Sequence, residues 1–191
     1  MSMLKIVACS LLVSGVAFAD GDMKPHGQLK GHGNLIKAEQ ELHASAKSIS
    51  KSQEANECVF GVEGGHGQKA KEAIVFAEKQ VWEAAEWVNT HAKDCEAFKP
   101  GKDIPKSNAI KLRAHPELKG HPNLIAAEKD LHSAYGAITK SQEANECVFG
   151  LEGGHGAKAK EAIEAAAHQI DEAAEWVSSH ANACTGKPGK M

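Results

Sequence analysis

The sequence lacks an excess of positive charge, a long apolar segment and the short motifs of the common catalytic centres. Its formal net charge is −3 and no basic patch stands out, which argues against nucleic acid as a partner. No apolar run reaches the ~20 residues of a membrane-spanning helix, so we expect no membrane insertion. The chain has no Cys-x-x-Cys-His, which excludes covalent haem, and no phosphate-binding loop or nucleophile elbow. These absences favour a non-catalytic protein over an enzyme.

Cysteine is also scarce, and its use depends on the first 19 residues. A lysine precedes an apolar run over residues 6–16, and Ala-Phe-Ala follows, which is the pattern of a signal peptide cleaved after Ala19. We therefore expect a periplasmic or secreted protein. Removal of the signal leaves an even number of cysteines, which indicates two disulfides in an oxidising compartment. The four residues are Cys58, Cys95, Cys147 and Cys184.

The rest of the chain contains one unit twice. Residues 26–95 align with residues 115–184 without a gap, and 46 of the 70 positions are identical. All four remaining cysteines and ten of the eleven histidines fall in register, and only His168 has no counterpart. The predicted organisation is a first repeat at 20–95, a linker at 96–114, a second repeat at 115–184 and a flexible tail at 185–191.

Each repeat has the periodicity of two helices, at 34–57 and 67–95 in the first copy. Small and apolar residues recur every three or four positions, which places them on one face of each helix. In the first copy these residues are Leu35, Ala38, Leu42, Ser45, Ile49, Ser52, Ala70, Ile74, Ala77, Val81, Ala84 and Val88. A hairpin of ~70 residues cannot bury enough apolar surface alone. We therefore predict an all-α four-helix bundle made of two duplicated antiparallel hairpins.

The geometry of the second helix constrains the disulfides. A helix of nearly 30 residues is ~40 Å long, and it separates Cys58 from Cys95, whereas bonded cysteines need Cα atoms within ~7 Å. The bridges are therefore predicted to join the two copies. If the hairpins pack side by side in the same sense, the pairs are Cys58–Cys147 and Cys95–Cys184. If they pack head to tail, the pairs are Cys58–Cys184 and Cys95–Cys147. The linker permits both, and we expect the first because it requires no crossing of the bundle.

The paired histidines are the candidate functional residues. Side-by-side hairpins would gather one set at one bundle end and a second set, His66 and His155, at the other. The first set is His32, His91, His121 and His180. Imidazole nitrogens suit Cu, Zn or Ni, so these residues are candidate metal ligands. The alternative is that they only cap helices, since His121 precedes a proline of the kind that a first helical turn accepts.

Two segments of the second copy resemble a known family. "GHPNLIAAEKDLHSA" at Gly120–Ala134 and "EGGHGAKAKEAIEAA" at Glu152–Ala166 are similar to repeats in small exported bacterial proteins. Those proteins carry a HPNL…GGH…KA motif in an alanine-rich helical bundle and have no firmly assigned activity. The first copy departs from the motif at Gly33, where the family pattern has proline. A weaker similarity to the small metal-binding proteins of the periplasm implies binding of copper or other divalent ions, although this chain has fewer histidines.

The sequence therefore predicts an exported, disulfide-stapled bundle that binds a transition-metal ion through paired histidines and has no catalytic activity. The alternative function is that of a structural or partner-binding envelope protein whose histidines only cap helices. The sequence names no protein partner.

Overall fold

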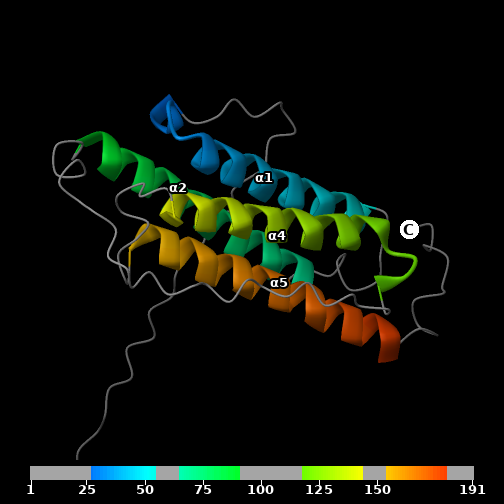
Figure 1. The fold of residues 1–191 in the computed structure, drawn as a ribbon. Helices are drawn as coiled ribbons and strands as arrows, with labels where there is room; N and C mark the ends of the chain where they lie inside the picture. The colour runs from blue at the N-terminus through cyan, green and yellow to red at the C-terminus, as the bar shows by residue number, and fades with distance from the viewer. Residues whose placement is uncertain (1–26, 55–64, 91–117, 144–153, 180–191) are drawn as a thin grey trace, which may run out of the picture.

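The computed structural model describes residues 27–54, 65–90, 118–143 and 154–179, and this part of the chain is helical. Four long helices lie side by side (Figure 1), so the prediction of an all-α fold with four helices is confirmed. A short 3-10 helix, η1, precedes them. The bounds are η1 Gly27–Leu29, α1 Gly33–Glu54, α2 His66–Thr90, α4 Pro122–Glu143 and α5 His155–Ser179. None of these helices is long and apolar enough to cross a membrane.

The first helix of each copy begins at the sequence Leu-Lys-Gly-His. Leu29 is fully buried, and its carbonyl accepts a hydrogen bond from the amide of His32 at 2.9 Å. The residue before His32, Gly31, has a φ of +96°, a conformation that residues other than glycine rarely adopt. The carbonyl of His32 then accepts the first helical bond, from Ile36. The same turn recurs before α4, where Gly120 has a φ of +100°.

The second helix of each copy begins after two glycines. The carbonyl of Gly65 accepts a bond from Lys69, and the carbonyl of Gly154 accepts one from Lys158. These glycines therefore occupy the N-cap positions of α2 and α5, where glycine is tolerated. The histidine that follows is the first residue of each helix. At this position the imidazole of His66 contacts α5 and the imidazole of His155 contacts α2.

The core is the stripe that the periodicity predicts. Large side chains at its centre, such as Leu42 of α1 and Ile74 of α2, are fully buried. Their counterparts Leu131 and Ile163 are buried to the same degree. Alanines at the stripe positions between them let the helices approach closely. Burial of each large aliphatic side chain contributes about 1.5–3 kcal/mol, which makes this stripe the main stabilising element.

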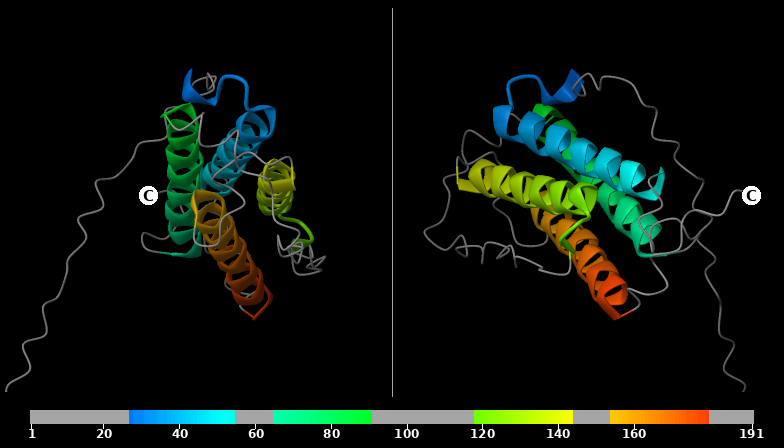
Figure 2. Two further views of the ribbon diagram at one scale, coloured as in Figure 1. Left: turned by 60° about the vertical axis from the view of Figure 1, so that its left-hand side comes forward. Right: turned by 90° about the vertical axis from the view of Figure 1, so that its right-hand side faces the viewer.

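The two copies pack head to tail. α1 lies mainly against α4, and α2 mainly against α5, so equivalent helices of the two copies are neighbours (Figure 2). The hydroxyl of Ser45 donates to the carbonyl of Ala127 at 3.0 Å, and Ser133 donates to Glu41 at 2.9 Å. Residue numbers thus fall along α4 as they rise along α1, which makes these helices antiparallel.

The expectation of side-by-side hairpins is therefore wrong. Every neighbouring pair in the bundle is antiparallel, an arrangement that opposes the helix dipoles. The segment that connects the copies is long enough for head-to-tail packing. It has 27 residues between Thr90 and Leu118, and a chain of this number of residues can extend far beyond the length of one helix. One end of the bundle holds the start of α2 and of α4 together with the ends of α1 and α5. The other end holds the remaining four termini.

Candidate functional site

The start of α2 carries an imidazole that is held by two side chains of the other copy. His66 Nδ1 lies 3.1 Å from Gln169 Oε1 and 3.2 Å from Glu172 Oε2, both on α5. Gln169 in turn donates from Nε2 to Glu172 Oε2 at 2.8 Å, which fixes the direction of its amide. Both partners of His66 Nδ1 are therefore acceptors, and this nitrogen carries the proton.

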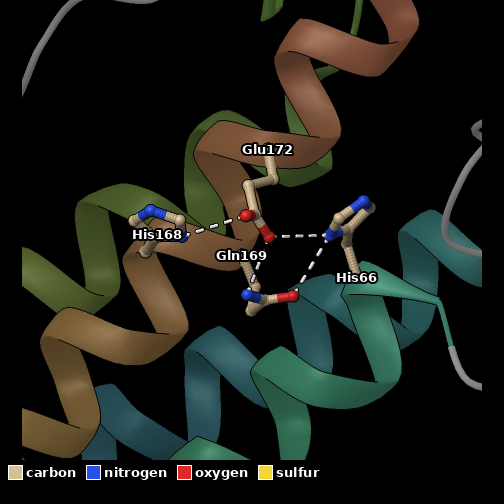
Figure 3. A network of polar contacts seen from close by, with 4 residues as sticks. All are labelled: His66, His168, Gln169 and Glu172. Carbon is tan, nitrogen blue, oxygen red and sulfur yellow. Dashed lines mark hydrogen bonds and ion pairs between the residues drawn. The ribbon is translucent and has the colours of Figure 1, made fainter.

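A second imidazole approaches the same carboxylate from the opposite side. His168 Nδ1 lies 3.5 Å from Glu172 Oε1, one helical turn away on α5 (Figure 3). The side chain of His168 is 68% exposed, whereas that of His66 is 24% exposed. Figure 3 shows the two outer ring nitrogens pointing away from each other, so only the Nδ1 atoms converge. One carboxylate thus bridges imidazoles from the two copies.

The opposite end of the bundle repeats this arrangement with one change. His155 Nδ1, at the start of α5, lies 3.0 Å from Gln80 Oε1 and 3.4 Å from Glu83 Oε2 of α2. Gln80 Nε2 donates to Glu83 Oε2 at 2.9 Å. The position of His168 is taken by Lys79, whose Nζ lies 3.7 Å from Glu83 Oε1. The second group of side chains therefore has the ammonium group of Lys79 at the position where the first group has the imidazole of His168.

We name each group by the residues that distinguish it. The two-histidine cluster consists of His66, His168, Gln169 and Glu172. The lysine cluster consists of His155, Lys79, Gln80 and Glu83. In the lysine cluster the ammonium group of Lys79 lies beside Glu83, whereas the two-histidine cluster has no lysine beside Glu172 at the equivalent position. The two-histidine cluster is accordingly the more favourable of the two for a cation.

The structure separates histidines that the sequence analysis grouped together. His32 and His121 are the N-cap residues of α1 and α4 and lie at opposite ends of the bundle. His66 and His155 also lie at opposite ends, so neither predicted gathering forms. Both groupings assumed hairpins in the same sense, and the head-to-tail packing removes that basis. The remaining predicted residues, namely His91, His180, Cys58, Cys95, Cys147 and Cys184, lie outside the described residues.

Five other residues of the clusters were missed from the sequence, together with the role of His168. A signal exists for all of them except Lys79: Gln-x-x-Glu occurs at the same place in both copies, as Gln80–Glu83 and Gln169–Glu172. On a helix this spacing places the two side chains next to each other. The sequence marks His168 only as the histidine without a counterpart; its ring is exposed, and it contacts Glu172.

A metal ion could be bound at the two-histidine cluster only if one of its imidazole rings turned. Among the residues that the structure describes, no three His, Cys, Asp or Glu side chains are already placed to hold one ion. His66 and His168 contact opposite oxygens of Glu172, so a shared ion needs one ring to turn. The exposure of His168 allows such a turn. His43 and His132 belong to neither cluster, and their Nδ1 atoms are buried and have no hydrogen-bond partner within the described part.

A second polar group lies inside the first copy, between α1 and α2. Glu39 is 1% exposed and accepts a hydrogen bond from the indole N–H of Trp82. Glu78, one turn from Trp82, is 4% exposed, and its Oε1 has no hydrogen-bond partner in the described region. Burial, and next the charge of Glu39, raise the pKa of Glu78 to about 8. This carboxyl group is therefore protonated at neutral pH. Its counterpart in the second copy is Ala167.

Comparison of the chain with protein-family models, with curated proteins and with solved structures gives no match. The two clusters at the start of α2 and of α5 are therefore the features from which a function can be inferred.

Proposed function

We propose that this chain is an exported, non-catalytic protein that binds one transition-metal ion, Cu(II), Zn(II) or Ni(II), at the two-histidine cluster. The observation that supports the proposal is the convergence of two imidazole Nδ1 atoms, from different helices, on the carboxylate of Glu172. Two imidazoles and one carboxylate form a donor set that these metals accept. The signal sequence supports a periplasmic or secreted location, where such ions are encountered.

The spacing of the donors is compatible with coordination. Bonds of 2.0–2.2 Å in a tetrahedral site place neighbouring donor atoms about 3.3 Å apart. His66 Nδ1 is 3.2 Å from Glu172 Oε2, and His168 Nδ1 is 3.5 Å from Oε1 of the same carboxylate. An ion would displace the proton of His66 Nδ1, and His168 would turn toward it. Since metal and proton compete for these nitrogens, binding weakens as the pH falls below the titration of the imidazoles.

The lysine cluster supplies the matched control. We would titrate Cu(II), Zn(II) and Ni(II) into the mature oxidised chain by calorimetry. The expected result is one saturable site per chain, which His168→Lys weakens at least tenfold because it reproduces the lysine cluster. Lys79→His should create a second site at the other end. His155→Ala should leave the single site unchanged.

Affinity that is unaffected by His168→Lys and by Glu172→Gln would contradict the proposal. A saturable site that is lost only on substitution of His32 or His121 would move the ligands to the helix caps.

A second candidate function is that of a structural or partner-binding envelope protein. It is favoured by His155, which makes the same contacts with glutamine and glutamate without a second histidine. Such contacts join the two copies whether or not a metal is bound. Absence of saturable metal binding, together with equal losses of stability in His66→Ala and His155→Ala, would support this function instead.

A further inference from the structure

Most of the packing in this bundle is between the copies and not within them. α1 lies mainly on α4 and α2 mainly on α5, while helices of the same hairpin share a smaller contact. The polar contacts at the two ends follow the same rule, because His66 is held by Glu172 and His155 by Glu83. Each hairpin therefore presents the same face to the other, as in a two-fold symmetric dimer interface.

We propose that this face also joins hairpins of different chains, so that the protein forms a hairpin-exchanged dimer. In this dimer the first hairpin of each chain packs on the second hairpin of its partner, and the partner is a second copy of this chain. Every contact described between the two hairpins of the monomer is then made between chains. Because these contacts are the same in both forms, the connection between the hairpins decides which form prevails.

The position of that connection makes exchange accessible. It leaves α2 at Thr90 and enters the second copy at Leu118, at opposite ends of the bundle. α2 has 25 residues and is therefore about 37 Å long. The 27 residues between these points can reach about 90 Å when extended. The connection is therefore long enough either to close within one chain or to cross to another.

Exchange would build both clusters from two polypeptides. His66 of one chain would contact Glu172 of its partner, and His155 would contact the partner's Glu83. This consequence rests on the head-to-tail contacts and is independent of the proposed metal. Failure of metal binding and failure of exchange are consequently separate results.

Shortening the connection tests the proposal. Deletion of residues 97–117 leaves six residues, which span about 25 Å at most and cannot run along the bundle. Under reducing conditions we expect this chain to be a dimer by size-exclusion chromatography with light scattering, with the circular dichroism of the intact chain. A chain in which an equally long Gly/Ser segment replaces the same 21 residues should be a monomer when it is refolded at low concentration, as is expected of the intact chain. A folded monomer of the shortened chain would overturn the proposal.

Two further measurements keep the test decisive if the shortened chain does not fold. In the first, the intact chain is refolded from denaturant at low and at high protein concentration. We expect the dimer to form only at high concentration and to persist after dilution. A benzoylphenylalanine in place of Glu41, which faces Ser133, should cross-link the dimer between chains and the monomer within one chain. Absence of dimer at every concentration, or a dimer that cross-links only within chains, would overturn hairpin exchange.

Discussion

Trp82 donates its indole N–H to the carboxylate of Glu39 across the seam between α1 and α2. Glu78, one turn before Trp82 on α2, is a second buried carboxyl group, and the same position of the second copy holds Ala167. A buried acid without a complete set of hydrogen bonds is costly when charged. It is retained here in its neutral form, and this links the stability of the first hairpin to pH.

The first prediction is that stability falls as the pH rises from about 4.5 to about 8. The pKa of Glu78 is raised from 4.5 to about 8 in the folded chain, so the folded state holds a proton that the unfolded state has released. Through this window the free energy of unfolding should fall by about 1.4 kcal/mol per pH unit from this group. Urea denaturation of the wild type and of Glu78→Gln at several pH values measures the difference.

Glu78→Gln should remove this contribution and be the more stable protein at pH 8, by several kcal/mol. Glu86→Gln is the matched control, because Glu86 lies on the same helix and is exposed. A wild type and a Glu78→Gln variant with parallel stability curves would show that Glu78 titrates normally.

The second prediction concerns two glycine substitutions with opposite effects. Gly136→Ala, in the middle of α4, should raise the free energy of unfolding by about 0.5–1 kcal/mol, because nothing lies within 4 Å of the added methyl group and alanine favours helix. Gly31→Ala should lower it by about 1–2 kcal/mol, although space is equally open there, because its φ is +96°. Thermal or urea unfolding measures both, and effects of the same sign would refute the backbone argument.

The helices and their buried faces could be predicted from the sequence because they depend on local spacing. Leu35, Leu42 and Ile49 recur at helical intervals, and all three are fully buried. The relative direction of the copies could not be predicted in this way, because the stripe is the same for either direction. The head-to-tail direction is accompanied by polar pairs beside the stripe, such as Glu41 with Ser133, whose partners are about ninety residues apart in the sequence.

The candidate site was only partly predictable for the same reason. His66 was identified as a candidate ligand because it is repeated at His155. His168 has no counterpart in the first copy, and Glu172 lies outside the periodic apolar stripe, so neither was identified as a candidate ligand. Only the packing of α2 against α5 brings them together.

The third prediction is the pairing of the cysteines. The ends of α1 and α5 lie at the same end of the bundle, and Cys58 and Cys184 follow those two helices in the chain. Head-to-tail packing thus predicts the pairs Cys58–Cys184 and Cys95–Cys147. Peptide mapping of the oxidised chain without reduction should find these two bridges. Recovery of Cys58 bonded to Cys147 would be incompatible with the arrangement of the helices.

The fourth prediction uses the two clusters as a pair. His66→Ala and His155→Ala should each lower the free energy of unfolding of the metal-free chain by about 1 kcal/mol, because each removes the same partly buried contacts to the other copy. Chemical denaturation in the presence of a chelator measures both losses. A loss confined to one of the two variants would show that the clusters are not structurally equivalent.

The offset of 89 residues between the copies gives the molecule an internal standard. Glu78 can be compared with Ala167, and His168 with Lys79, under one set of solution conditions and within one polypeptide. A duplicated scaffold of this kind permits one half to acquire a titratable residue while its twin preserves the unmodified packing. Specialisation of one half then requires no change in the architecture that both halves share.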